Sequence, residues 1–122
     1  MGDGFMASFP SVTQALDCAI AVQRAFAERN AGAAEPLRVR IGVNAGEPIA
    51  EDNDLFGTAV TLAARIAGDA AGGEVLVSDV VRQLVSGKRY AFTDGGLRTL
   101  RGFDEPVRLY ELRVTEWQER KL

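Results

Sequence analysis

The sequence predicts an α/β (α+β) fold in which helices pack on a mixed β-sheet, and three observations support this prediction. Helical and strand-like patterns alternate in the first two thirds of the chain, whereas short strands cluster in the last third. The chain has 122 residues, of which 47% are hydrophobic, enough for one core in a chain of single-domain length. No repeat, low-complexity segment or linker marks a boundary, so we expect residues 1–122 to form one domain.

The first expected strand covers residues 4–9, an apolar run that follows the turn Gly2-Asp3-Gly4 and stops at Pro10. The first helix follows, because Ser11 and Gln14 form a capping box and apolar residues continue at helical spacing to about Asn30. Cys18 lies within this helix, where a small buried thiol is a simpler explanation than a nucleophile.

Residues 37–43 alternate apolar and polar side chains and predict a strand that extends toward Ala45. After an acidic loop, residues 54–65 begin a helix, with Gly68 and the pair Gly72-Gly73 at its end. In chain order the remaining expectations are a strand at 74–77, a Ser78-capped helix from Asp79 to about Val85, a strand at 90–93, a turn at Asp94-Gly95-Gly96, a strand at 97–100, a turn at 101–106 and a strand at 107–114.

Composition excludes several classes of function. The 14 basic and 17 acidic residues give a formal charge of -3 and no basic footprint, so we expect no nucleic-acid partner. The absence of histidine means that any metal site must use oxygen ligands, which favours magnesium, manganese or calcium. There is no signal-like start and no apolar stretch near the roughly 20 residues of a membrane span, so we expect a soluble, cytoplasmic chain.

Two polar features are candidates for chemistry. Thr58, Thr61 and Arg65 stand at i, i+3 and i+7, so on a helix they form one polar stripe, with Asp54 just before its first turn. The turn at Asp3 places a carboxylate between two glycines that would let a ligand approach the backbone. A solvated helix face with an Asp cap, and a plain Asp-Gly turn, explain the same residues without any ligand.

Four stretches taken in order resemble the catalytic domain of class III nucleotidyl cyclases, the adenylate and guanylate cyclase family. They are Gly2-Asp3-Gly4, residues 40–48 (RIGVNAGEP), residues 54–65 (DLFGTAVTLAAR) and residues 100–112 (LRGFDEPVRLYEL). The resemblance extends from Gly2 to about Leu112. It implies a ferredoxin-like nucleotide cyclase fold that pairs head to tail, with active sites in the cleft between two catalytic domains.

The resemblance also implies roles for individual residues. Asp3 matches the second of two aspartates that hold two divalent metals, Mg²⁺ or Mn²⁺, on the nucleotide phosphates. Asp54 matches the adenine-selecting position, Arg65 the arginine that stabilises the transition state, and Arg101 the site of a phosphate-binding lysine. Thr61 stands where the family usually has a ribose-orienting asparagine, and its hydroxyl offers one donor in place of two. The implied reaction is attack of a 3′-hydroxyl on the α-phosphate of ATP, giving 3′,5′-cyclic AMP and pyrophosphate.

The family's domain begins well before the Gly-Asp-Gly turn, with a strand bearing the first metal aspartate, two helices and a strand bearing a base-selecting lysine. The chain therefore resembles an N-terminally truncated cyclase domain, and we expect it to be inactive alone. The alternative is a catalytically degenerate module that binds nucleotide, or pairs with a complete cyclase domain, as a regulatory partner. An unrelated α/β domain with a solvated helix stripe is the third possibility.

The absent segment leaves two possibilities for the sheet: the strands on either side of the gap close directly on each other through a right-handed crossover, or another chain fills the gap, and we favour the second. In the family's sheet the absent strand would lie between residues 5–9 and 39–43, and unpaired backbone in a buried sheet costs about 1–3 kcal/mol per group. We therefore expect a homodimer or a strand-exchanged oligomer, or pairing with a complete cyclase domain.

Overall fold

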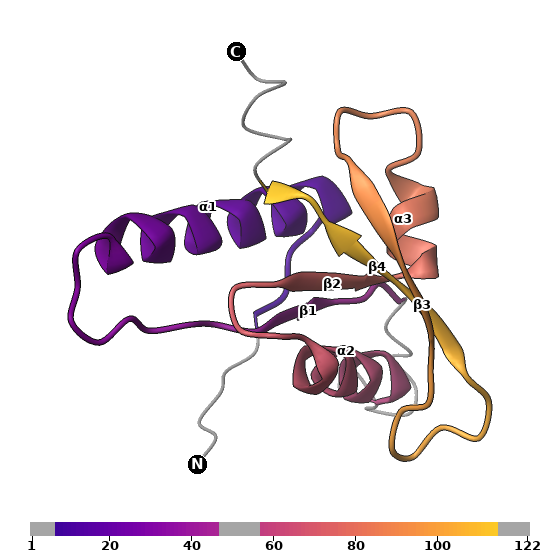
Figure 1. The fold of residues 1–122 in the computed structure, drawn as a ribbon. Helices are drawn as coiled ribbons and strands as arrows, with labels where there is room; N and C mark the ends of the chain where they lie inside the picture. Colours follow the sequence, from indigo (N-terminus) through magenta and orange to yellow (C-terminus); the bar gives the residue numbers. More distant parts are fainter. Residues whose placement is uncertain (1–6, 47–56, 115–122) are drawn as a thin grey trace.

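The computed structural model describes residues 7–46 and 57–114, in which helices cover both faces of a four-stranded sheet (Figure 1). The elements in chain order are α1 (Val12–Asn30), β1 (Ile41–Val43), α2 (Thr58–Asp69), β2 (Val75–Ser78), α3 (Asp79–Leu84), β3 (Phe92–Arg98) and β4 (Val107–Leu112). No helix within these ranges combines the length and the apolar character that crossing a membrane requires.

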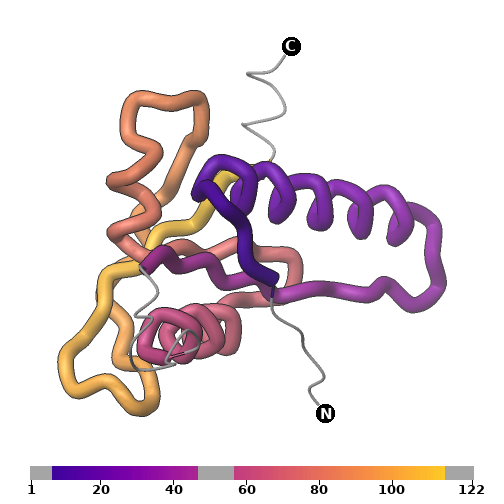
Figure 2. The backbone as a smooth tube through the Cα atoms, turned by 180° about the vertical axis from the view of Figure 1, so that it is seen from behind, coloured from indigo at the N-terminus to yellow at the C-terminus, as the bar shows by residue number. Residues whose placement is uncertain are grey.

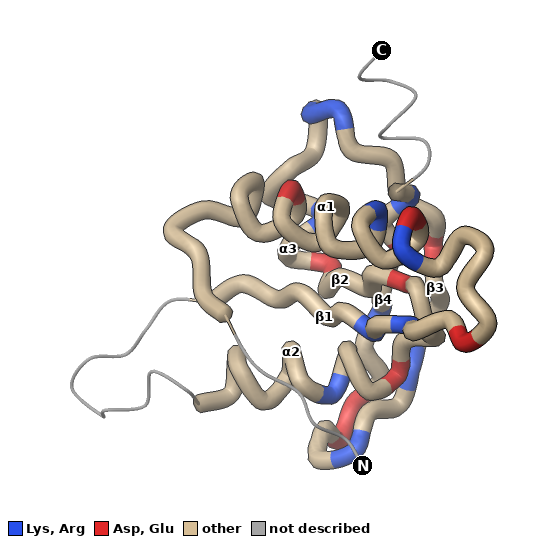
Figure 3. The backbone as a smooth tube through the Cα atoms, turned by 90° about the vertical axis from the view of Figure 1, so that its left-hand side faces the viewer, with Lys and Arg blue, Asp and Glu red and all other residues tan. Residues whose placement is uncertain are grey.

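The sheet is mixed, with the strand order β1-β2-β4-β3. Strands β1 and β2 run parallel and are connected through α2, whereas β4 is antiparallel to both of its neighbours. Helices α1 and α2 lie on opposite sides of β1 and β2 (Figure 3), which gives three layers. The predicted α/β fold, a mixed sheet with helices packed on it, is confirmed.

Strand β2 is buried on both faces and carries much of the core. Its alternating side chains divide between two clusters: Val75 and Val77 pack with α1 and α3, and Leu76 packs with α2. Each such aliphatic side chain contributes about 1.5–3 kcal/mol through its removal from water. Strand β2 therefore joins the two apolar clusters on opposite faces of the sheet.

Helix α1 begins as predicted, because the Ser11 Oγ accepts the Gln14 backbone N–H at 3.1 Å. It ends at Asn30, and the chain returns to the sheet through residues 31–40 (Figure 2). The prediction of a buried Cys18 is wrong, because this side chain is exposed. At about 100° per residue, Cys18 points roughly opposite to Leu16, which is fully buried.

Two polar side chains attach α1 to the rest of the fold. Gln23 is buried, and its Nε2 donates to the backbone oxygens of Val39 at 2.9 Å and Glu74 at 3.3 Å. The Tyr90 hydroxyl donates to Asp17 Oδ1 at 2.6 Å, and burial together with this bond raises the Tyr90 pKa far above its ordinary value.

Two predicted strands differ from the structure. Residues 37–40 are not part of β1, and Leu37 is 52% exposed, because pairing with the short β2 extends only from Ile41 to Val43. The second is the strand predicted at residues 4–9. Only residues 7–9 of this range are described, and they are exposed and do not form a strand. Their apolar side chains lack a sheet neighbour among the described residues; residues 4–6 lie outside these residues.

The predicted turn at Asp94-Gly95-Gly96 is wrong, because these residues form an irregularity inside β3. Pairing with β4 continues on both sides of it, from Asp94 opposite Tyr110 to Leu97 opposite Arg108. Gly96 has a φ of 84°, and a Cβ on Gly95 would lie 2.9 Å from the Leu109 carbonyl oxygen. The glycines therefore permit a bulge, and the chain reverses only after Arg98.

The helices and strands of the second half otherwise follow the predictions closely. Ser78 caps α3 by accepting the Val81 N–H at 3.4 Å. Helix α2 ends at Asp69, so Gly68 lies inside its last turn and not beyond its end.

Candidate functional site

The candidate site is built on α2, which lies unusually close to β1. A Cβ on Gly42 would lie 2.6 Å from the Ala63 carbonyl oxygen and 2.9 Å from the Ala67 Cα, so only glycine allows this approach. Asn44, directly after β1, donates from Nδ2 to the Ala59 carbonyl oxygen at 3.1 Å. These contacts fix the position of α2, and with it the direction of its polar stripe.

The stripe predicted from the sequence faces outward. Thr58 and Thr61 are exposed and Arg65 is half-buried, whereas the next residue, Ile66, is fully buried. The helical spacing therefore brings two hydroxyls and a guanidinium to one side of α2.

Arg65 also contacts a segment distant in sequence. Its Nε–H donates to the Arg101 backbone oxygen at 3.0 Å, in the turn between β3 and β4. Among the described residues, neither the terminal nitrogens of Arg65 nor the exposed Arg101 side chain has a hydrogen-bond or ion-pair partner. A planar guanidinium held at one edge and open at the others suits a phosphate group.

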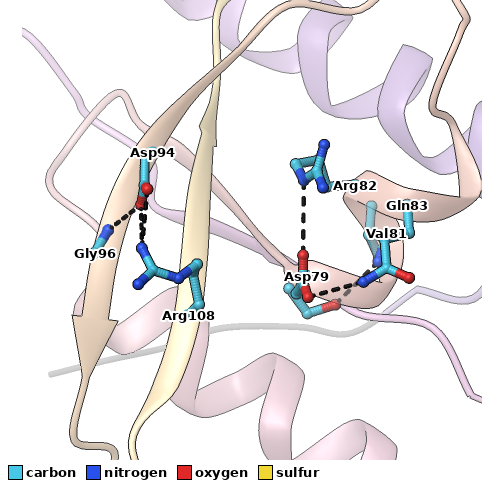
Figure 4. A network of polar contacts seen from close by, with 8 residues as sticks. Asp79, Val81, Arg82, Gln83, Asp94, Gly96 and Arg108 are labelled. Atoms are coloured by element: carbon cyan, nitrogen blue, oxygen red, sulfur yellow. Dashed lines mark hydrogen bonds and ion pairs between the residues drawn. The ribbon is translucent and has the colours of Figure 1, made fainter.

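The β3–β4 hairpin carries charges on both faces. Arg98 bonds Asp69 at the end of α2, with Nη1 2.9 Å from Oδ2. On the other face, Asp94 accepts the Gly96 N–H at 2.7 Å and an Arg108 N–H at 2.9 Å (Figure 4). The Gly96 bond, and then the Arg108 guanidinium, lower the pKa of Asp94 below its ordinary value.

The structure thus brings together three of the predicted site residues, Thr61, Arg65 and Arg101, on α2 and the adjacent turn. Asp3 and Asp54 lie outside the described residues. In residues 7–46 and 57–114, no group of three His, Cys, Asp or Glu side chains could hold a metal ion. The predicted metal and base-selecting roles therefore stay predictions.

Sequence reasoning missed three contacts of this region: the Arg65–Arg101 backbone bond, the Asn44 bond to α2, and the Asp69–Arg98 pair. Asn44 stands inside the RIGVNAGEP stretch, so its type and place offered a signal. The other two join residues 36 and 29 positions apart, and no local pattern marks them.

Residues 1–114 match the family described as the adenylate and guanylate cyclase catalytic domain. Among curated proteins, putative adenylate cyclase 3 of Rhizobium meliloti is 38% identical over 112 residues, covering 89% of this chain and 19% of that protein. A pH-sensitive adenylate cyclase of Mycobacterium tuberculosis is 38% identical over 82 residues, covering 62% of this chain and 20% of that protein. The chain thus spans about a fifth of the length of these two relatives.

Solved structures give a matching result. An adenylate/guanylate cyclase/hydrolase from Silicibacter pomeroyi is similar with 34% sequence identity and a TM-score of 0.73, covering 85% of this chain and 63% of that one. An adenylyl cyclase from P. aeruginosa has 24% identity and a TM-score of 0.66, covering 84% and 58% respectively, and its likeness concerns the fold alone.

Proposed function

The chain belongs to the adenylate and guanylate cyclase catalytic domain family, and we propose that it supplies the Arg65 side of an adenylate cyclase active site. The proposed reaction converts ATP to 3′,5′-cyclic AMP and pyrophosphate. The observation that carries the proposal is the Arg65 guanidinium, held by the Arg101 backbone oxygen with its terminal nitrogens open. The names of two relatives, both called adenylate cyclases, support ATP over GTP.

In this proposal each residue does what its side chain allows. Arg65 donates to phosphate oxygens that gain negative charge as the bond to pyrophosphate breaks, and Arg101 attracts the same phosphates. Thr61, exposed one turn before Arg65, hydrogen-bonds a ribose hydroxyl. Asp54 accepts a hydrogen bond from the adenine amino group. Guanine has a carbonyl oxygen at the same position and cannot donate this bond, so Asp54 favours ATP.

Divalent cations, Mg²⁺ or Mn²⁺, would neutralise phosphate charge when bound, and Asp3 is the residue we propose as a ligand. Asp3 lies outside the described residues, among which no group of three His, Cys, Asp or Glu side chains could hold a metal ion. Residues 1–122 are proposed to form one partial cyclase domain that completes its site by pairing, with a second copy or with a complete cyclase domain.

A second candidate function is a catalytically degenerate module that binds nucleotide or dimerises as a regulatory partner. The observation that favours it is Thr61, whose short hydroxyl replaces the amide that the family resemblance leads us to expect. The shorter side chain reaches less far and donates one hydrogen bond, so a bound nucleotide would be less well oriented.

Calorimetric titration with ATP and pyrophosphate, followed by chromatography for cyclic AMP in the same samples with Mg²⁺ or Mn²⁺, tests the proposal. We expect Arg65→Ala to weaken binding of both ligands, whereas Arg29→Ala, a control at the end of α1 away from α2 and the hairpin, should not. Binding without cyclic AMP, even after a complete cyclase domain is added, would select the regulatory module. Unchanged binding by Arg65→Ala would overturn the proposed site.

A further inference from the structure

The end of α2 is bonded to the β3–β4 hairpin through Arg98. Its Nη1 lies 2.9 Å from Asp69 Oδ2 and 3.4 Å from the Asp69 backbone oxygen, while its Nε donates to the Gly95 backbone oxygen at 3.0 Å. One guanidinium thus bridges the last residue of a helix and the bulge of a strand. A planar group with several donors in fixed directions can make such a bridge, whereas a lysine ammonium cannot reproduce its geometry.

The bulge that presents the Gly95 oxygen is itself held in shape. Asp94 bonds the N–H of Gly96 two residues later and pairs with Arg108 on the neighbouring strand (Figure 4). A side chain on Gly95 would meet the Leu109 carbonyl oxygen, so the bulge lies tightly against β4. Arg98 therefore connects α2 to a well-supported part of the sheet.

The Arg98 bridge lies next to the Arg65 contact along both segments. Asp69 follows Arg65 by one turn of α2, and Arg101 closely follows Arg98 at the end of β3. Among the described residues, the hydrogen bonds between α2 and the hairpin are those made by Arg65 and Arg98. The two contacts therefore join α2 to the hairpin at neighbouring points, beside the apolar cluster that packs between them.

We propose that Arg98 is a positioning residue for Arg65, a role that rests on the anion-binding function proposed above. By holding Asp69 against the bulge, Arg98 keeps Arg65 Nε bonded to the Arg101 oxygen and its terminal nitrogens turned outward. The Asp69 and Arg98 side chains are 37% and 30% exposed, so the pair contributes little to stability and acts through orientation. Without it, Arg65 must be ordered when the anion binds, which weakens binding about two- to tenfold.

The test compares Arg98→Met with Arg29→Met, a matched control that removes an arginine bonded to Asn30 and Glu35 at the end of α1, away from α2 and the hairpin. NMR with isotope-labelled arginine follows exchange of the Arg65 Nε–H with water, assigned by its loss in Arg65→Lys. We expect slow exchange in the wild type and the control, and fast exchange in Arg98→Met. Pyrophosphate affinity should fall two- to tenfold in Arg98→Met only, and Arg98→Lys, which reaches fewer acceptors, should be intermediate.

Slow exchange and wild-type pyrophosphate affinity in folded Arg98→Met would overturn the positioning role. If that variant does not fold, Asp69→Leu replaces it, since leucine has a similar size and no side-chain acceptor for Arg98. An unchanged Arg65 signal and affinity would then overturn the role. Failure of the proposed function has a different signature, namely no pyrophosphate binding that depends on Arg65. The exchange measurement still decides whether Arg98 positions Arg65 in that case.

Discussion

Replacing Gly42 with alanine should push α2 away from the sheet. The added Cβ would lie 2.6 Å and 2.9 Å from backbone atoms of Ala63 and Ala67, and backbone cannot rotate aside as a side chain can. Gly42 is not among the glycines with positive φ, so the effect comes from the contact alone. Overpacking costs about 1–3 kcal/mol, here near the upper limit, and alanine recovers about 0.5–1 kcal/mol of backbone entropy. The expected net loss is about 2 kcal/mol.

Thermal unfolding with urea titration measures this loss. With an unfolding entropy of about 2.1 cal/mol/K per residue, a chain of 122 residues that unfolds as one unit changes its Tm by about 4 °C per kcal/mol. Gly42→Ala should therefore lower Tm by about 8 °C. Gly68→Ala is the matched control, because its Cβ would meet no atom within 4 Å. It should raise Tm by about 4 °C through better helix propensity. A Gly42→Ala protein within 2 °C of wild type would refute the tight approach of α2 to β1.

Four further predictions concern stability, catalysis and assembly. Tyr90→Phe should destabilise the fold by about 1–3 kcal/mol, since it removes the hydroxyl that bonds Asp17; equal urea midpoints would contradict this. Because the Tyr90 pKa is raised, the folded state holds the phenol proton more tightly than the unfolded state does. The resulting contribution to the free energy of unfolding is complete below about pH 10 and is lost as the pH rises further. In Tyr90→Phe, the free energy of unfolding should lack this part of its decrease at alkaline pH. In an assembly that turns over ATP, Arg65→Ala should lower kcat about 10²-fold, and a change confined to KM would reassign Arg65 to ground-state binding. Asp54→Ala should lose preference for ATP over GTP, so an unchanged turnover ratio would remove Asp54 from base selection. Light scattering at micromolar concentration should show a dimer or larger oligomer, and a folded monomer would contradict the expected pairing.

Features that depend on nearby residues were predictable from the sequence. The Ser11 and Ser78 caps, the extent of α1 and the outward stripe of α2 each arise from side chains within a few positions of one another. The exposure of Cys18 follows from the same helical geometry, so the wrong prediction of a buried thiol was avoidable. The types of β2, α3 and β4 also followed from capping residues and alternation.

Features that depend on distant partners were not predictable in this way. The Asp94-Gly95-Gly96 segment has the composition of a turn, and only its pairing with β4 makes it a bulge. Gln23 has the pattern of an ordinary polar helix residue, yet it is buried, and its amide donates to two backbone oxygens in the segments that lead into β1 and β2.

The sequence by itself determined the family, the helix that carries the polar stripe, and the identities of Thr61, Arg65 and Arg101 as candidate site residues. Tertiary structure decided that Arg65 reaches the Arg101 backbone and that Arg98 joins α2 to the hairpin. Helical periodicity is set by local backbone geometry, so a short stretch of sequence reveals it. The direction of a long side chain depends on which acceptors the packed core places within its reach, and that is settled only when distant segments meet.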